Sequence, residues 1–254
     1  MQKILASNKF YVFSKFVNDY SNLEFFKKSR LSSIYVIKGK AEFIIENLNK
    51  KVLIEKDQGL IVTPNVSLKP VSGNFELLES CSLVEDKEII EIVDSHGNRT
   101  ENILDNYKVI TDPKKVIKPW GYEKWISWFK HHHVLKEIHM TKGNKCSLQF
   151  HRYKYETNII IKGTAKVLKD IIIKNDLNEN EALNEFKKIK DLESFFRNAD
   201  AGFYWSNVPN EIHRVFSTED YTAYETSTPE LDDVIRIADD TKRSSGLILS
   251  EHNE

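Results

Sequence analysis

The feature that most constrains the fold is a repeated pattern of strand, glycine turn and strand. The segment Ile34–Ala41 recurs as Asn158–Ala165, with Ile-Lys-Gly at the same place in both. Further on, Gly59–Leu68 parallels Gly202–His213, and both segments contain a Pro-Asn pair. Short β-branched runs separated by Gly, Pro, Asn and Asp turns predict an antiparallel barrel or jelly roll rather than an α/β fold. The repeat therefore predicts an all-β chain of two tandem antiparallel barrels.

The length of 254 residues is enough for two ordinary domains. The polar stretch Asp94–Asn102 is a natural place for the join, and we place the domain boundary directly after it. Residues 1–105 then form the first barrel and residues 106–254 the second.

A charged insertion interrupts the second barrel between Val167 and Gly202. Within it, the segment Asn180–Phe196 places Leu183, Phe186, Ile189 and Phe196 near one face of a helix. We interpret the insertion as a surface helix docked on the barrel, and a lid over the barrel mouth is the alternative.

Composition excludes several classes of function. The 37 basic and 38 acidic residues nearly cancel, so no global field favours nucleic acid or a membrane surface. Only Cys81 and Cys146 are present, which gives no disulfide framework and suggests a reducing compartment. The N-terminus lacks the apolar core of a signal peptide, and no apolar run approaches the roughly 20 residues that span a bilayer. We therefore expect a cytoplasmic protein.

Four side chains of the second half suit a divalent metal ion: Gln149, His151, Glu156 and His213. On a strand, Gln149 and His151 are two residues apart and face the same side. Glu156 begins an apolar, β-branched run that predicts the next strand, and His213 arrives from a later one. An amide oxygen, two imidazoles and a carboxylate can hold Zn²⁺, Mn²⁺, Fe²⁺ or Co²⁺.

The first half lacks these ligands. In the repeat, Leu68 takes the place of His213 and Ser32 the place of Glu156, and residues 1–95 contain no histidine. We therefore interpret the first barrel as a degenerate copy without metal ligands, used for packing, dimerisation or walling the second site.

Several motifs of the second half occur in the order found in one known family. They are Lys118-Pro119-Trp120-Gly121, Lys136-x-Ile138-x-Met140-x-x-Gly143, Ser147-Leu148-Gln149-Phe150-His151, His213-Arg214-Val215, Glu225 and Asp232-Asp233-Val234-Ile235-Arg236. Together they resemble the cupin isomerase domain of type II mannose-6-phosphate isomerases, over roughly residues 114–245. The resemblance implies two cupin-type jelly rolls, the second with a helical insertion.

The resemblance also implies roles for particular residues. Gln149, His151, Glu156 and His213 would hold one divalent ion, for which we expect Zn²⁺, with Mn, Fe, Co or Ni as alternatives. Lys136 and Arg236 would face the phosphate or the reacting carbons of the substrate, and Glu225 would be a further polar group in the pocket. Tyr153 and Thr157 stand where the family usually has histidine, and Asn158 replaces its usual tryptophan. We expect Tyr153 and Asn158 to contact a substrate that differs from mannose 6-phosphate.

The chemistry expected of this site is aldose–ketose isomerisation of a phosphorylated sugar. Such a reaction needs a group that moves a proton between C1 and C2, and Lys136 and Glu225 are both candidates. Arg236 can neutralise the developing charge or grip a phosphate. A sugar or nucleotide-sugar epimerase, a metal-dependent dioxygenase and a non-catalytic sugar-binding module are the alternatives. From the resemblance alone we expect a role in nucleotide-sugar or surface-polysaccharide precursor synthesis, and exposed barrel edges favour a homodimer.

Two other polar features have simpler interpretations. We interpret His131-His132-His133 as an exposed loop run rather than a metal site. Glu211, close to His213, we interpret as an exposed side chain rather than a fifth ligand.

Overall fold

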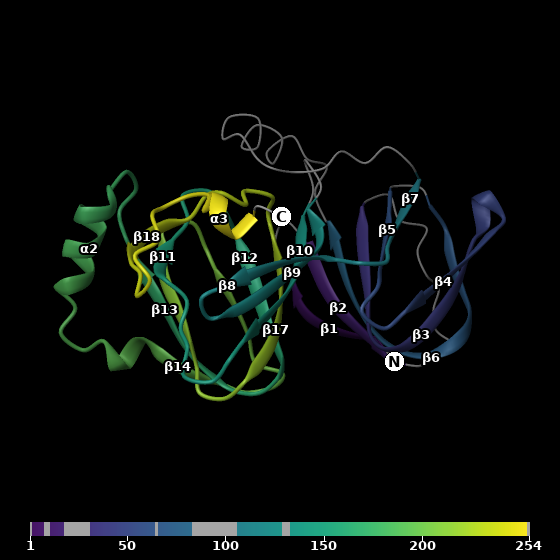
Figure 1. Ribbon diagram of the computed structural model, residues 1–254, viewed down its shortest axis with the longest axis horizontal. Coiled ribbons are helices and arrows are strands. Elements are labelled where there is room, and N and C mark those ends of the chain that lie inside the picture. Colours follow the sequence, from purple (N-terminus) through teal and green to yellow (C-terminus); the bar gives the residue numbers. More distant parts are fainter. Residues whose placement is uncertain are drawn as a thin grey trace. The chain divides into compact units, whose positions relative to one another are not determined.

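The computed structural model describes residues 2–7, 11–17, 31–63, 66–82, 106–128 and 133–252. These residues are almost entirely antiparallel β structure and form two compact units (Figure 1). The first unit contains strands β1 to β7 and also residues 125–128 and 133–135, and the second contains residues 115–124 and 136–252. The predicted join, Asp94–Asn102, lies outside the described residues, so the boundary at 105/106 stays a prediction.

The first unit is built on one seven-stranded sheet. Its strands run in the order β1-β2-β6-β3-β5-β7, and β4 pairs with β3. Their bounds are β1 Gln2–Ser7, β2 Tyr11–Val17, β3 Ser32–Ile45, β4 Lys50–Glu55, β5 Gly59–Val62, β6 Leu68–Ser82 and β7 Tyr107–Ile110, with a short 3-10 helix at Glu46–Leu48. The core of this unit comes from alternate residues of β3, β4, β5 and β6, among them Ile34, Leu60 and Leu77.

The second unit is a jelly roll of two sheets, in which the end of β9 and the start of β10 are the residues that group with the first unit. The six-stranded sheet has the order β15-β12-β17-β10-β9-β8, and the five-stranded sheet has the order β14-β13-β16-β11-β18. The strand bounds are β8 Lys114–Lys118, β9 Gly121–Trp128, β10 Val134–Met140, β11 Leu148–Phe150, β12 Glu156–Lys162, β13 Ala165–Ile172, β14 Phe196–Ala199, β15 Tyr204–Asn207, β16 Glu211–Ser217, β17 Tyr221–Ser227 and β18 Ile235–Ala238.

The repeated glycine turn is present in both units. Gly39 and Gly163 have φ values of +75° and +80°, which L side chains rarely adopt. A Cβ on Gly39 would lie 1.7 Å from the carbonyl oxygen of Asn74, and one on Gly163 would lie 2.1 Å from that of Asp220. Both turns therefore require glycine, as the repeat in the sequence suggests.

The predicted helix in the insertion is confirmed but is shorter than expected, because it ends at Lys187, before Ile189, and Phe196 instead begins strand β14. The helix docks on the outside of the barrel. Helix α2, Glu179–Lys187, begins with a capping box between Asn178 and Glu181. Its apolar residues pack against Phe150 and Ile212, which alternate along their strands with the predicted ligands and so face the opposite side of the sheet. Helix α2 lies beside β18 (Figure 1). A second short helix, α3, spans Leu249–His252.

Two interpretations of polar residues are wrong. His133 is buried in the first unit, where its Nδ1 and Nε2 each lie 2.9 Å from a serine hydroxyl, of Ser82 and Ser33 respectively. Glu211 is also buried, and its carboxylate accepts hydrogen bonds from the backbone N–H groups of Val208 and Asp170. Both side chains satisfy buried polar groups of the fold. His131 and His132 lie outside the described residues.

Both cysteines are free thiols. Among the helices of the described residues, none combines the length and the apolar character needed to cross a bilayer.

Candidate metal centre

Three of the four predicted ligands converge inside the second unit. One ligand atom each from His151, Glu156 and His213 lie within 4.8 Å of one another. The Nε2 atoms of both histidines are 3.5 Å from the Glu156 carboxylate, and the two rings lie 5.0 Å apart. All three side chains are buried. The two sheets of the second unit bring them together: Glu156 begins β12 in the six-stranded sheet, whereas His213 lies in β16 and His151 directly follows β11 in the five-stranded sheet.

Backbone carbonyl groups orient both imidazole rings. Nδ1 of His151 hydrogen-bonds to the carbonyl oxygen of Asp233, and Nδ1 of His213 lies 2.9 Å from that of Glu211. Because a carbonyl only accepts, each Nδ1 carries a proton, and Nε2 is the nitrogen left to face a metal ion. This is the tautomer of a metal-binding histidine whose second nitrogen is held by the protein.

Gln149 completes the group from β11. It stands opposite His213 in the strand register, and its amide nitrogen is 3.4 Å from Nε2 of that ring. The amide oxygen accepts a hydrogen bond of 2.5 Å from the Ser147 hydroxyl. Rotating the amide by 180° would aim the oxygen at the cluster and let the nitrogen donate to Ser147, since a hydroxyl also accepts.

Charge and burial keep these ligands in their metal-binding protonation states. Burial lowers the pKa of His213 to about 4, so the ring is neutral at physiological pH. Burial alone would raise the pKa of Glu156, but the ammonium of Lys154 and contacts with His151 hold it well below its usual range. A carboxylate beside the neutral imidazole of His213 and the ring of His151 is a suitable site for a cation.

The residues present fit a divalent ion. The Nε2 atom of His151 is buried and has no hydrogen-bond partner, although a lone pair in that setting needs one. Over the described residues, this is also the single cluster of three or more His, Cys, Asp or Glu side chains with metal-ligand spacing. His, His, carboxylate and amide ligands suit Zn²⁺ and the late first-row metals.

Asp233 holds the loop that carries His151 and Lys154. Its carboxylate accepts hydrogen bonds from three successive backbone N–H groups, of Arg152 at 3.0 Å, Tyr153 at 2.6 Å and Lys154 at 2.9 Å. Its own carbonyl oxygen is the one that orients His151. One residue of the β17–β18 connection therefore fixes both the loop and the imidazole.

A buried lysine that the sequence did not single out lies beside the cluster. The Nζ atom of Lys154 is 2.5 Å from the Glu156 carboxylate and 2.8 Å from that of Glu225. Burial alone would lower the pKa of Lys154, but these two carboxylates raise it well above its usual value. Lys154 is therefore a fixed positive charge, which links a predicted metal ligand to a predicted catalytic residue.

Lys136 and Glu225 also face this interior, as the resemblance implies. The Nζ atom of Lys136 is 3.9 Å from the Glu225 carboxylate and 3.5 Å from that of Glu123. Glu225 stands opposite Asn158 in the pairing of β17 with β12. All of these except Glu123 are at least nine-tenths buried.

The remaining predicted substrate contacts divide into two groups. Arg236 pairs with Gln149 across β18 and β11, so it faces the same interior, and its Nη1 donates to the carbonyl oxygens of Ser244 and Gly246. Its Nε is buried without a partner. Tyr153, by contrast, is 41% exposed and is not gathered into the buried cluster.

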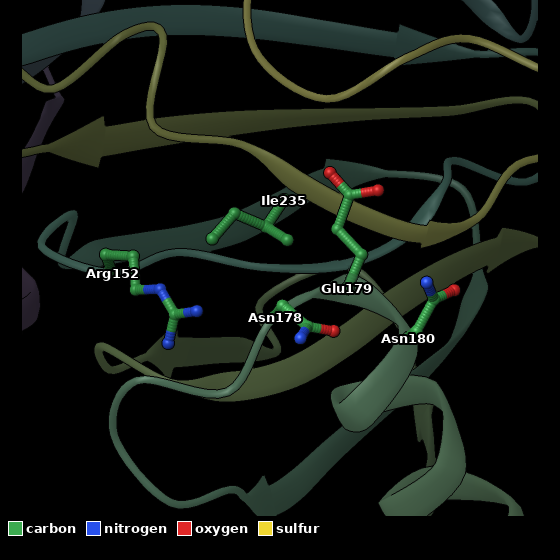
Figure 2. Close-up of a pocket in the computed structure, with 5 residues that line it drawn as sticks. All are labelled: Arg152, Asn178, Glu179, Asn180 and Ile235. Carbon is green, nitrogen blue, oxygen red and sulfur yellow. The ribbon is translucent and has the colours of Figure 1, made fainter.

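A separate groove lies on the outer face of the five-stranded sheet. Figure 2 shows Arg152 and Ile235 near the start of helix α2. Ile235 precedes Arg236 in β18, so the two side chains face opposite sides of the sheet. The guanidinium of Arg152 is already bonded to the Leu177 carbonyl and the Asn210 side chain. This groove is therefore distinct from the metal-ligand cluster.

Comparisons with known proteins agree with the fold. The chain resembles oxalate decarboxylase of Lactobacillus farciminis, with a TM-score of 0.58 at 10% identity over 90% of this chain and 80% of that one. It resembles Streptomyces albus HEPD with 2-hydroxyethylphosphonate and Fe(II) bound, with a TM-score of 0.61 at 8% identity over 89% and 70%. For quercetin 2,3-dioxygenase of Acinetobacter baumannii the TM-score is 0.55 at 9% identity, over 87% and 74%.

The fold and these neighbours define the chain as a protein of two cupin-type jelly rolls, which confirms the prediction. Residues 105–194 match the family "Mannose-6-phosphate isomerase C-terminal", so the resemblance of the second half to that domain is confirmed as well. No curated protein matches the sequence.

Proposed function

We propose that the second unit is a divalent-metal-dependent isomerase that interconverts an aldose and a ketose of a phosphorylated sugar. The observation that carries the proposal is the buried cluster of His151, Glu156 and His213, with both Nε2 lone pairs aimed inward beside Lys136, Lys154 and Glu225. The family match over residues 105–194 supports the choice of an isomerase. A bound divalent ion would polarise the sugar carbonyl and offset negative charge on the enediolate.

The protein side chains supply the rest of the chemistry. Glu225 is the group that we place in the proton transfer between C1 and C2, because its carboxylate can accept a proton while the raised pKa of Lys154 keeps that ammonium charged. Lys154 and Lys136 offset the negative charge that develops on the substrate oxygens. Arg236, with an unpaired Nε, suits the phosphate.

The test is proton NMR of the Zn²⁺-loaded protein in D₂O with hexose, pentose and heptose phosphates. We expect loss of a C1 or C2 proton signal of the substrate, abolished by EDTA. Glu225→Gln should slow this exchange by about 10²–10⁴-fold, the usual contribution of a general base. The matched control is Glu79→Gln, which changes the buried glutamate at the corresponding position of the first unit and should leave exchange intact.

Other outcomes identify other functions. Exchange with an epimer as product indicates an epimerase, and consumption of O₂ with Fe²⁺ bound indicates a dioxygenase. Sugar binding without exchange indicates a binding module, and any of these three results rejects the isomerase. A homodimer, a cytoplasmic location and a role in precursor synthesis for nucleotide sugars or polysaccharides are part of the same proposal, and sedimentation of the purified protein tests the first.

A further inference from the structure

Strands β15, β12 and β17 are neighbours in one sheet, and their inward-facing side chains form two rows across it. Residues paired across antiparallel strands point to the same face, and so do residues two positions apart on a strand. Glu156 stands opposite Asn207 and Ser227, and two residues further on, Asn158 stands opposite Trp205 and Glu225. We call these six residues the polar grid.

Three members of the polar grid have buried polar atoms without a partner. They are Nε1 of Trp205, Oδ1 of Asn207 and Oγ of Ser227. The residues are 4%, 1% and 0% exposed, so bulk water does not satisfy these atoms. Leaving one such atom unpaired is unfavourable, and native proteins leave few of them. Three such atoms lie in adjacent rows of one sheet, two of them opposite the predicted metal ligand Glu156 and one in the next row. Their grouping therefore points to a bound molecule.

The chemistry of the three atoms selects the kind of molecule. An indole N–H only donates, an amide oxygen only accepts, and a serine hydroxyl does both. A sugar hydroxyl both donates and accepts, so it can pair with each of them. A phosphate only accepts, and here it would face the Asn207 oxygen and the carboxylates of Glu156 and Glu225. The polar grid therefore favours neutral hydroxyl groups over a phosphate group.

The orientation of Asn207 is fixed by its other contact. Its Nδ2 donates to Glu156 at 2.7 Å, so its Oδ1 must be the atom that remains available. The unpaired Nε of Arg236 lies on the opposite sheet and suits an anion instead. The two sheets thus present different chemistry to the two ends of a substrate.

We propose that Trp205, Asn207 and Ser227 bind the hydroxyl groups of a polyhydroxylated sugar chain and so determine substrate specificity. The inference rests on the proposed function, and it adds residues to which the resemblance assigns no role. The phosphate of the sugar lies toward Arg236, away from the polar grid.

The test compares ligand affinity in two serine variants of the Zn²⁺-loaded full chain. Ser227→Ala removes only the unpaired hydroxyl, whereas the control Ser206→Ala removes a hydroxyl from the opposite face of the same sheet, where it bonds to Thr157 at 2.7 Å. Calorimetry would use inorganic phosphate, a panel of hexose, pentose and heptose phosphates, and their deoxy analogues. Trp205→Phe, which removes the indole N–H, is the second test variant.

We expect Ser227→Ala to weaken binding of a sugar phosphate by about 3- to 10-fold, the value of one neutral hydrogen bond, and to leave phosphate binding unchanged. The loss should vanish for the one deoxy sugar that lacks the contacted hydroxyl. The melting temperature should stay level or rise, because an unpaired buried hydroxyl is removed. Ser206→Ala should bind like the wild type.

Three results would overturn the inference: equal sugar affinity in Ser227→Ala, Trp205→Phe and the wild type, an equal loss in Ser206→Ala, or no sugar binding by the wild type. The proposed function is tested apart from this, since binding needs no turnover. Sugar affinity that depends on Ser227 without deuterium exchange rejects the isomerase and keeps the polar grid. Deuterium exchange together with an unchanged sugar affinity in Ser227→Ala keeps the isomerase and rejects the polar grid.

Discussion

The two units use one pattern of strand pairing for different purposes. In each, a central strand lies between two neighbours, and six inward positions form two rows. The second unit fills them with Glu156, Asn158, Trp205, Asn207, Glu225 and Ser227, and the first with Ser32, Ile34, Leu60, Val62, Glu79 and Cys81. In the first unit these positions include core residues, such as Ile34 and Leu60. The metal ligands therefore depend on a few side chains and not on the backbone.

Hydrogen bonding separates the units in the same way. In the first unit, buried Glu79 accepts a 2.5 Å hydrogen bond from Ser32, and His133 bonds to Ser33 and Ser82. Among the described residues, all buried side-chain polar atoms without a partner belong to the second unit: His151 Nε2, Trp205 Nε1, Asn207 Oδ1, Ser227 Oγ, both oxygens of Glu230 and Arg236 Nε. In the first unit these buried polar groups form hydrogen bonds with one another. In the second unit several buried polar atoms have no protein partner and remain available to a ligand.

The largest effect expected from this comparison is the loss of metal from the second unit alone. His213→Ala removes one imidazole ligand and should abolish stoichiometric Zn²⁺ binding. Leu68→Ala, at the corresponding position of the first unit, should leave binding intact while costing about 2–5 kcal/mol of stability, as expected for a buried leucine. Metal analysis of the purified proteins, with chelator competition, checks both. Full Zn²⁺ binding by His213→Ala would show that His213 is not a metal ligand and that the two units do not differ in this way.

A smaller loss of affinity is expected when the support of the metal-binding loop is removed. Asp233→Ala deletes the carboxylate that accepts three backbone N–H groups. Zn²⁺ affinity should fall by about 10- to 100-fold, the usual effect of disturbing the groups behind a metal ligand. Asp240→Ala is the control, because that exposed carboxylate pairs with Arg214 and Lys145. The absorption spectrum of bound Co²⁺ should show an altered coordination geometry in Asp233→Ala and no change in Asp240→Ala.

Acid should destabilise the metal-free second unit. The pKa of His213 is about 4 in the folded protein and 6.5 in the unfolded chain. As the pH falls, the unfolded chain therefore takes up a proton on His213 before the folded protein does. This contribution is fully present above pH 6.5 and is lost as the pH falls to about 4. It amounts to about 3 kcal/mol. Thermal unfolding of the EDTA-treated protein across that range should show the loss, and His213→Gln should flatten the slope. An identical slope in the variant would contradict this assignment.

The smallest effect concerns an unpaired carboxylate. Burial raises the pKa of Glu230, so the folded state favours its protonated form and stability falls as the pH rises from about 4.5 through the raised pKa. Glu230→Gln should therefore raise the melting temperature at pH 8 by roughly 2–4 °C, corresponding to about 1 kcal/mol, and by less at pH 5. Calorimetry at the two pH values checks the sign. A lower melting temperature at pH 8 would show that the carboxylate is stabilised in the fold.

Much of the fold could be predicted because its signals are local. The glycine turns at Gly39 and Gly163 and the strand that begins near Glu156 depend on neighbouring residues. The spacing of Leu183, Phe186, Ile189 and Phe196 predicted a helix, and α2 packs Leu183 and Phe186 as expected. It ends at Lys187, so Ile189 and Phe196 lie beyond it. The position of the domain join and the roles of the site residues remain predictions.

The rest of the site could not be predicted from the sequence. Lys154 lies two residues from Glu156 in a loop, and nothing in the sequence shows that its ammonium lies between two carboxylates. Asp233 belongs to the motif Asp232–Arg236, but its hydrogen bonds depend on how the β17–β18 connection meets the loop after β11. The sequence predicted exposed side chains for Glu211 and His133. Both are buried, because their hydrogen-bond partners, such as Asp170 and Ser33, are distant in the sequence.

The sequence by itself determined the strand and turn pattern, the duplication, and the ligand types offered by Gln149, His151, Glu156 and His213. These follow from residue type and from the alternation of side chains along one strand, which is a local property. Only the tertiary structure decided that Asn207 and Ser227 flank Glu156, and that both imidazoles point Nε2 inward. The reason is that pairing between strands far apart in the sequence sets which side chains meet, and no local pattern encodes that register.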